Sequence, residues 1–240
     1  MIAVICAAGE GKRLKPYTDN CPKCLIKIGE KTIIEYMLDN ISKAGINNVI
    51  IVIGYKKNEV INKIGYKYKN CNIRYVINDN YSNTNNMYSL WLAMKHINED
   101  IVFFNADILF NVSILKDVLN PKYENMIAVS SEIKEDSMRV VIEDNLIKKL
   151  GKGINDNFSG DAIGIYKISR KTSKEYFTIA SKFISEGKIN ISFVEPINSL
   201  ANKIHFNPVY AKNNKCAEID NLEDYENVKK FLADIIALAK

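Results

Sequence analysis

The chain has 240 residues, of which 47% are hydrophobic and 25% are charged, and its formal net charge is +5. This composition is that of an ordinary soluble globular protein with a sizeable core. The positive charge is spread along the chain, which mildly favours anionic small molecules and argues against a nucleic acid partner. No apolar segment is long enough to span a bilayer, and the N-terminus lacks a basic leader. We therefore expect no membrane insertion and a cytoplasmic location.

The predicted elements of the first half alternate between strand and helix. Continuous apolar runs predict buried strands at 2–8, 47–55, 72–79 and 100–110. Apolar residues at helical spacing predict helices at 31–45, with Gly45 at its C-terminal cap, and at 57–68 and 86–97. This alternation indicates right-handed βαβ units around a parallel sheet.

The second half reads differently. Residues 125–132, 138–145 and 146–153 resemble consecutive strands joined by turns, and a further strand is predicted at 161–169. A helix at 173–187, a strand at 203–212 and a final helix at 222–240 complete the chain. No repeat, linker or low-complexity segment is present. We therefore expect one compact α/β domain with mixed strands in its C-terminal half.

The five cysteines are odd in number and scattered, as expected of reduced thiols in a cytoplasm. Cys21 and Cys24 form a C-x-x-C pair. A lone pair makes a poor zinc site, and this one follows a polar loop rather than a strand, unlike a thioredoxin motif. Ordinary packing of Cys24 is the favoured interpretation, with metal or redox use as the alternative.

Residues 7–14, Ala-Ala-Gly-Glu-Gly-Lys-Arg-Leu, follow the first predicted strand. Small residues here allow a ring or ribose to lie against the backbone, and successive amides can point at phosphate oxygens. Leu14 stands where a dinucleotide fingerprint needs its third glycine, and Arg13 where a P-loop needs Ser or Thr. A kinase glycine loop belongs in a hairpin. With these three motifs set aside, the favoured interpretation is a phosphate-binding loop in which Arg13 and Lys23 are fixed cations. The alternative is a turn whose basic side chains are solvated.

The same region carries a longer pattern, G-x-G-x-R-L-x-P-x-T followed by P-K, from Gly9 to Lys23. It resembles that of nucleotidyltransferases of the sugar-1-phosphate and bacterial choline-phosphate cytidylyltransferase type, and the resemblance extends over essentially the whole chain. It implies a single Rossmann-like domain over 1–240, with a nucleotide-binding half (1–110) and an acceptor-binding half (111–240). The nucleotide-binding residues that it implies in the loop are Ala7, Ala8, Gly9, Glu10 and Gly11.

Two aspartates are candidates for a Mg²⁺ site. Asp107 lies at the end of the fourth predicted strand, and Asp220 lies between the strand-like 215–219 and the last helix. Carboxylates at two strand ends can share one Mg²⁺ with phosphate oxygens. For Asp220 the alternative is a helix cap, since Asn221 and Asp224 lie close by. The resemblance implies that both aspartates bind metal.

The sequence contains no motif for a nucleophilic side chain or a general base, which is consistent with transfer between phosphate groups. The chain has only two histidines, neither in a motif, and no nucleophile elbow or Cys/His constellation. A phosphate monoester is already mostly ionised at neutral pH, so it needs no general base to attack an α-phosphorus. Positioning and charge neutralisation then carry catalysis. Arg13 is expected to hold the leaving pyrophosphate, and Lys23 to offset charge at the α-phosphate.

Residues 85–90, Asn-Asn-Met-Tyr-Ser-Leu, resemble a stretch of the bacterial choline-phosphate cytidylyltransferases. The sugar enzymes usually carry Gln-Pro and Gly-Leu-Ala segments in this region. The resemblance implies CTP as the nucleotide, with Asn86 at the base edge and Ser89 in the nucleotide site. The alternative for Asn86 is a loop former or helix cap.

The acceptor site is expected in the C-terminal half. The resemblance implies Lys152 at the acceptor phosphate and Asp161 at a cationic head group, with tyrosines available to stack on a quaternary ammonium. For Asp161 the alternative is a turn residue after Ser159 and Gly160 that contacts no ligand. Ala162 and Ala217 replace aromatic residues that the family commonly has, which changes the pocket. Phosphocholine and aminoalkyl phosphonates or phosphates are the expected acceptors.

Three other functions stay open. A sugar- or inositol-1-phosphate nucleotidyltransferase is the first, and a non-catalytic nucleotide-binding regulatory module is the second. The intact set of Arg13, Lys23, Asp107 and Asp220 argues against the second. A dinucleotide oxidoreductase is a distant third. Nothing in the sequence indicates the oligomeric state.

Overall fold

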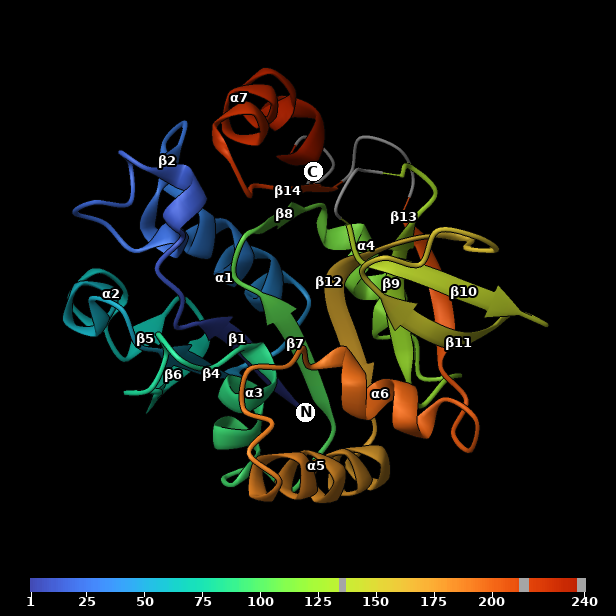
Figure 1. The fold of residues 1–240 in the computed structure, drawn as a ribbon. Helices are drawn as coiled ribbons and strands as arrows, with labels where there is room; N and C mark the ends of the chain where they lie inside the picture. Colours follow the sequence, from blue (N-terminus) through green and yellow to red (C-terminus); the bar gives the residue numbers. More distant parts are fainter. Residues whose placement is uncertain (134–136, 212–215, 237–240) are drawn as a thin grey trace.

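In a computed structural model, which describes residues 1–133, 137–211 and 216–236, a central sheet is covered by helices on both faces (Figure 1). Helices α1, α2, α4 and α7 share one apolar core with the sheet, and α3, α5 and α6 share another. The chain is a single α/β domain. No helix in the described part of the chain is long and apolar enough to cross a membrane.

The strands, in chain order, are β1 Ile2–Ala7, β2 Lys27–Ile28, β3 Lys31–Thr32, β4 Asn48–Ile53, β5 Lys67–Tyr68, β6 Cys71–Ile77, β7 Ile101–Asn105, β8 Ile108–Phe110, β9 Met126–Ser130, β10 Arg139–Glu143, β11 Leu146–Gly151, β12 Gly160–Ile168, β13 Asn207–Ala211 and β14 Cys216–Glu218. The α-helices are α1 Ile33–Lys43, α2 Lys57–Ile64, α3 Asn86–Met94, α4 Val112–Val118, α5 Arg170–Ser185, α6 Val194–Leu200 and α7 Leu222–Ile236. Two short 3-10 helices are η1 Lys12–Leu14 and η2 Lys23–Leu25.

The main sheet has ten strands and the path β11-β10-β12-β7-β1-β4-β6-β5, with β9 paired to β12 and β13 paired to β9. Strands β7, β1, β4 and β6 run parallel, while β12 pairs antiparallel with both β7 and β9. The expected parallel sheet with mixed strands in the C-terminal half is therefore confirmed. The carboxyl ends of the parallel strands β1 and β7 meet at one edge, where ligands bind in open α/β folds.

Local sequence explains the elements near that edge. The β1 run is almost fully buried, as expected of a strand covered by helices on both faces. Thr32 and Glu35 form a reciprocal capping box at the start of α1. Gly65, with φ of 71°, ends α2, so the helix expected over 57–68 is shorter and β5 follows it.

Other predicted elements differ in detail. The strand expected over 100–110 is two strands, β7 and β8, separated by a turn at Ala106 and Asp107. Helices α4 and α6 were not predicted because each has only seven residues, too few for a clear period. The expected continuations of the strand to 212 and of the last helix to 240 lie outside the described residues.

Candidate active site

Asp107 and Asp220 are brought together by a small second sheet. Asp107 lies in the turn between β7 and β8, and Asp220 lies two residues after the end of β14. Strand β14 pairs antiparallel with β8, and the N–H of Ile219 donates to the carbonyl oxygen of Asp107 at 2.9 Å. In Figure 1 this pair of strands lies beneath α7 and above the carboxyl end of β7. Two carboxylates 113 positions apart in the sequence therefore meet at the ligand-binding edge of the sheet.

Lys23 joins these two carboxylates. Its Nζ lies 2.7 Å from Oδ2 of Asp107 and 2.8 Å from Oδ1 of Asp220, and Nη2 of Arg13 lies 3.0 Å from Oδ2 of Asp220. Burial alone would lower the pKa of Lys23, but the charges and hydrogen bonds of Asp107 and Asp220 outweigh it and raise that pKa. Burial would raise the pKa of Asp220, and Lys23 and Arg13 outweigh it and lower that pKa.

The phosphate loop holds the two cations in place. Gly11 has φ of 69°, and a Cβ at this position would lie 2.8 Å from the Cβ of Lys23, so only glycine fits there. Buried Thr18 donates its hydroxyl to the carbonyl oxygen of Gly11 at 3.0 Å and closes the loop. On the opposite side, Tyr225 of α7 packs on Tyr17, with ring centroids 4.7 Å apart, and donates its hydroxyl to the carbonyl oxygen of Lys27. Helix α7 therefore braces the loop that carries Arg13 and Lys23.

Asp220 is not the cap of α7. The side chain of Asn221 accepts from the N–H of Asp224 at 2.9 Å, and Asp224 in turn accepts from the N–H of Asp220. These neighbours take over the capping role, so the carboxylate of Asp220 is available to Lys23 and Arg13.

The residues present fit a divalent cation. Ligand oxygens of Asp107, Glu218 and Asp220 lie within 4.8 Å of one another. Within the described ranges, Oδ1 of Asp107 is buried and has no hydrogen-bond partner, although a buried carboxylate oxygen normally has one. Carboxylate oxygens are the ligands that Mg²⁺ prefers. Glu218 was not predicted from the sequence, although residues 218 and 220 are two apart and fall on one face of an extended chain.

These groups lie at the mouth of a cleft of about 600 Å³ between the two halves of the sheet. The predicted residues that line it are Ala8, Gly9, Arg13, Asn86, Ser89, Asp107, Lys152 and Asp220. A smaller adjoining pocket is lined by Glu10, Gly11, Arg13, Lys23 and Asp220, among others. Ala7 is buried in the core beneath the loop. Most of the residues predicted from the sequence therefore share one continuous site.

One end of the cleft carries a network of small polar side chains. Asn78, which is only 1% exposed, donates from Nδ2 to the hydroxyls of Thr84 and Ser89, both at 3.0 Å. Gly54 lies against this end, where a Cβ would come within 2.8 Å of the Tyr81 side chain and 2.9 Å of the carbonyl oxygen of Ala8. Only glycine fits at position 54, because Tyr81 and the backbone of Ala8 pack directly against it.

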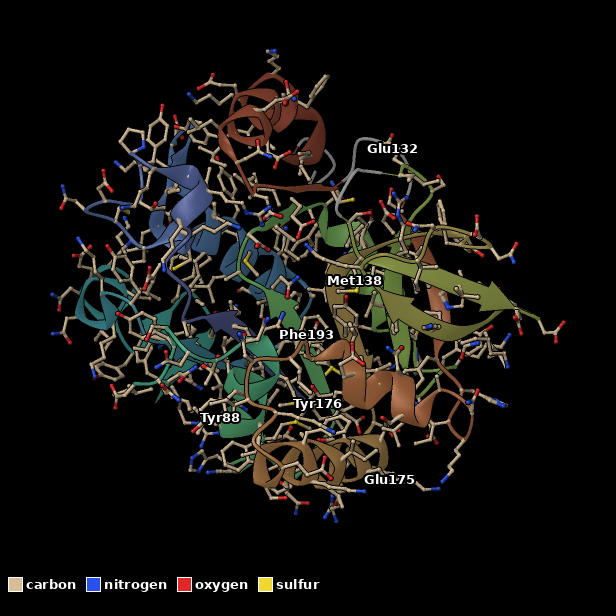
Figure 2. The ribbon with its side chains drawn as sticks, viewed as in Figure 1. Tyr88, Glu132, Met138, Glu175, Tyr176 and Phe193 are labelled. Carbon is tan, nitrogen blue, oxygen red and sulfur yellow. The ribbon has the colours of Figure 1, made fainter. Side chains whose placement is uncertain are left out.

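Asn86 connects this end of the cleft to the other. Its Oδ1 accepts a hydrogen bond from the N–H of Phe193 at 2.9 Å. Since a backbone N–H only donates, the side-chain atom that faces it is the oxygen, which leaves the NH₂ group of Asn86 for a ligand. In Figure 2, Phe193 lies between α3 and α6, close to the middle of the fold.

The other end of the cleft combines two charged groups with aliphatic walls. Lys152 and Glu195 are exposed and line the cleft, and neither forms an ion pair within the described residues. Met138 and Val194 also line the cleft. Glu195 was not predicted from the sequence, because no motif marks it.

The aromatic residues of the cleft do not form an open cage. Tyr166 and Phe193 are at most 2% exposed. The ring of Tyr166 is stacked on Phe103, with centroids 4.9 Å apart, and Phe193 contacts both rings edge-on. Tyr81 is the other aromatic residue among the described lining residues. The expected stacking of tyrosines on a quaternary ammonium therefore has little exposed ring surface available at this end.

Asp161 lies elsewhere than expected. It is 4% exposed and does not line the cleft; its Oδ1 lies 3.4 Å from Nη1 of Arg139, the residue directly opposite it on β10. The guanidinium of Arg139 also lies over the ring of Phe158, with its Cζ 4.4 Å from the centroid. A buried carboxylate is stable only when it is paired. Arg139 provides the positive charge opposite Asp161, where a cationic head group of the acceptor was expected.

The cysteines follow the favoured interpretation. Cys24 is 2% exposed in the apolar core, where burial raises the pKa of its thiol to about 12. Cys6, Cys21, Cys24 and Cys71 are free thiols. The Cys21–Cys24 pair belongs to no group of metal-binding side chains found among the described residues.

Comparison with known proteins agrees with this geometry. Residues 2–150 match the sequence profile of the Nucleotidyl transferase family. The choline-phosphate cytidylyltransferase of Streptococcus pneumoniae is 28% identical over 236 residues, which cover 97% of this chain and 98% of that protein. The CTP:phosphoglutamine cytidylyltransferase of Campylobacter jejuni is 31% identical over 188 residues, or 70% of this chain and 73% of that protein.

Among solved structures, the inositol-1-phosphate CTP transferase from T. maritima superimposes with a TM-score of 0.81 at 21% identity, covering 98% of this chain and 95% of that one. At this identity the likeness concerns the fold alone. The family match spans more than half of the chain and includes the phosphate loop and Asp107. The chain therefore belongs to the nucleotidyl transferase family and is a nucleotidyltransferase.

Proposed function

We propose that this enzyme transfers a cytidylyl group from CTP to a small phosphorylated acceptor with a cationic head, releasing pyrophosphate. The observation that carries the proposal is the cluster of Arg13, Lys23, Asp107 and Asp220 at the mouth of one cleft. Two relatives of this chain are named as cytidylyltransferases, and their named acceptors are choline phosphate and phosphoglutamine. Both acceptors are small and phosphorylated.

In the proposed reaction an oxygen of the acceptor phosphate, or phosphonate, attacks the α-phosphorus of CTP. A new P–O bond forms, the bond to the bridging oxygen of the β-phosphate breaks, and pyrophosphate leaves with the electron pair. No proton has to be removed from the attacking oxygen, which suits a site without a histidine. Arg13 binds the departing phosphates, and Lys23 offsets the charge on the α-phosphate.

A Mg²⁺ ion would complete the site. Asp107 and Asp220 would hold it, with Glu218 in reach, and the unpaired Oδ1 of Asp107 supports this assignment. When bound, the ion neutralises the phosphate oxygens that the two substrates bring together. The chain's own part is to keep the carboxylates within 4.8 Å through the β8–β14 pairing.

The halves of the chain divide the substrates between them. Residues 1–110 would hold the nucleotide, with Ala8, Gly9, Glu10 and Gly11 along its backbone and Ala7 supporting them from below. Asn86, through its NH₂ group, and Ser89 lie at the proposed base end. An NH₂ donor suits the O2 and N3 acceptors of cytosine.

Residues 111–240 would hold the acceptor. Lys152 is the cation available to the acceptor phosphate, and Glu195 is the carboxylate available to its positive head. In this proposal Glu195 takes the role expected of Asp161, whose charge Arg139 already meets. Because the walls are aliphatic, a primary ammonium hydrogen-bonded to Glu195 fits this end better than the trimethylammonium group of phosphocholine.

Four free thiols and a nucleotide substrate favour a cytoplasmic location for this reaction.

The experiment is a matrix of initial rates of pyrophosphate release in Mg²⁺. CTP, UTP, ATP, GTP and dTTP are each paired with phosphoethanolamine, phosphocholine, 2-aminoethylphosphonate, inositol 1-phosphate and glucose 1-phosphate. Asp107→Asn enzyme serves as the blank for contaminating activity. The proposal predicts the highest kcat/KM for CTP with an amine-bearing acceptor. A maximum with inositol or glucose 1-phosphate would move the enzyme to that branch, and no turnover with bound nucleotide would indicate a regulatory module.

A further inference from the structure

The start of helix α3 is tied to the segment between α5 and α6 across the cleft. The N–H of Phe193 donates to Oδ1 of Asn86 at 2.9 Å, and the N–H of Asn85 donates to the carbonyl oxygen of Ile189 at 3.2 Å. These residues lie more than 100 positions apart in the sequence. The first α3 turn lies at the proposed nucleotide end of the cleft, and the 189–195 segment at the proposed acceptor end.

The 189–195 segment is rigid on one side and exposed on the other. The ring of Phe193 is 2% exposed and packs against Phe103 and Tyr166, with centroids 5.2 and 4.7 Å away. Ser192, Val194 and Glu195 line the cleft around it. At the backbone N–H of Phe193, a side chain of the nucleotide half therefore holds the segment that carries Glu195.

Asn86 has one half of its amide engaged and the other half open. Its oxygen is used by Phe193, while its NH₂ group forms no hydrogen bond with another described residue, and the side chain lines the cleft. An amide with both functions in use holds a fixed plane, because rotation would break both contacts at once. A ligand that accepts a hydrogen bond from the NH₂ group would thereby also hold the oxygen against Phe193.

We propose that Asn86 is a positioning residue for the acceptor as well as a contact for the nucleotide. Its oxygen holds the 192–195 segment in place, and its NH₂ group binds the nucleotide base. Nucleotide binding therefore orders the acceptor segment, and by reciprocity the acceptor tightens nucleotide binding. The identities of the two ligands rest on the proposed function, whereas the link between the two ends rests on the hydrogen bonds alone.

The test compares Asn86→Ala, which removes both halves of the amide, with Asn86→Asp, which keeps an acceptor for Phe193 but no NH₂ donor. Ser181→Ala is the control, because Ser181 accepts from Nε1 of Trp91 and ties α3 to α5 away from the cleft. Hydrogen–deuterium exchange of a peptide covering 189–195 is followed with and without CTP, and CTP affinity is measured by calorimetry. KM values for the best acceptor are measured at saturating CTP.

In the wild type and in Ser181→Ala, CTP is expected to slow exchange in 189–195. In Asn86→Ala this segment exchanges faster, CTP no longer slows it, and the acceptor KM rises about tenfold, as expected for one lost hydrogen bond. Asn86→Asp recovers most of the acceptor KM while its CTP affinity stays weakened. A residue that served only the nucleotide would not show this division between the acceptor KM and the CTP affinity.

The proposal is overturned if Asn86→Ala keeps a wild-type acceptor KM at saturating CTP, or if CTP still protects 189–195 in that variant. If the wild type binds CTP but turns over none of the acceptors, the proposed function fails, and the exchange comparison still decides the role of Asn86. If CTP does not bind to the wild type at all, the proposed function fails, and the link between the two ends is decided by whether 189–195 exchanges faster in Asn86→Ala than in the wild type without nucleotide.

Discussion

The ammonium group of Lys23 bridges Asp107 and Asp220, at 2.7 and 2.8 Å from their carboxylate oxygens. Lys23 is buried for the most part, and its side chain is 16% exposed. Without a cation between them, two carboxylates at this separation would repel each other in a partly desolvated site. Lys23 thus supplies, within the protein itself, positive charge at the place where a metal and a triphosphate would meet.

Lys23→Met should lower the melting temperature of the metal-free enzyme, because it leaves the two carboxylates facing each other without a cation. Mg²⁺ should raise the melting temperature of Lys23→Met more than that of the wild type, because binding relieves this repulsion. Both effects are measured by thermal unfolding, once in EDTA and once in about 5–10 mM Mg²⁺. Lys174→Met, at an exposed lysine of α5, is the matched control. Equal Mg²⁺ stabilisation of all three proteins would contradict the proposed site.

Asp107→Asn and Asp220→Asn should each lower kcat/KM at least about a hundredfold while the far-UV circular dichroism spectrum is retained. Glu218→Gln should weaken apparent metal affinity about tenfold, because it removes one of three convergent carboxylates. Mn²⁺ binding, followed by electron paramagnetic resonance, reads metal affinity independently of turnover. Glu223→Gln, at an exposed position of α7, is the control. Unchanged Mn²⁺ affinity in the Asp107 and Asp220 variants would exclude these residues as ligands.

Glu195→Gln should raise the KM for an amine-bearing acceptor about tenfold and leave the KM for CTP near the wild-type value, since Glu195 lies in the cleft and forms an ion pair with no described cation. Asp161→Asn should instead lower the melting temperature, because it removes the buried negative charge that faces Arg139 on the neighbouring strand. If Asp161→Asn raised the acceptor KM selectively while Glu195→Gln did not, the original expectation for Asp161 would stand.

Asp39 should contribute stability that depends on pH. Burial would raise the pKa of Asp39, but hydrogen bonds and charges from Lys31 and Lys69 outweigh it and lower the pKa in the folded state. A carboxyl with a depressed folded-state pKa stabilises the fold above its ordinary value of about 4, and this contribution is lost as pH falls through the folded-state pKa. Urea unfolding is measured from pH 7 down to pH 3. The free energy of unfolding of Asp39→Asn should lie furthest below that of the wild type at neutral pH, and this difference should shrink as the pH falls. The control is Asp79→Asn, at an exposed carboxylate that pairs with Lys57; its stability should differ little from that of the wild type at any pH.

Much of the fold and of the phosphate site could be predicted from the sequence because the signals are local. The apolar run of β1 indicates a strand covered on both faces, and the glycine at position 11 indicates a loop that takes positive φ. Asp107 and Asp220 each lie two residues after the end of a strand, so the geometry of a parallel sheet places at least the first of them at the ligand-binding edge.

The acceptor end depended on information that no local pattern contains. Asp161 meets Arg139 because β10 and β12 pair in one particular antiparallel register, and a sequence without a hairpin signal between them does not set that register. Helix α6, which begins just before Glu195, is seven residues long and includes Pro196 in its first turn. A helix this short shows no clear period in the sequence and so was not predicted. The position of the segment that carries Glu195 depends on the long-range hydrogen bond between Phe193 and Asn86.

The most direct test of cytidylyl transfer is the product formed when the nucleotides compete. Wild-type enzyme is incubated in Mg²⁺ with equal concentrations of CTP, UTP, ATP, GTP and dTTP and one amine-bearing acceptor, and ³¹P NMR and mass spectrometry identify the products. The account predicts one dominant product, a CMP unit joined through a new P–O–P linkage to the acceptor phosphate or phosphonate, with one pyrophosphate per linkage and none formed by Asp107→Asn enzyme. A dominant product from another nucleotide, or no linked product although CTP is bound, would contradict it.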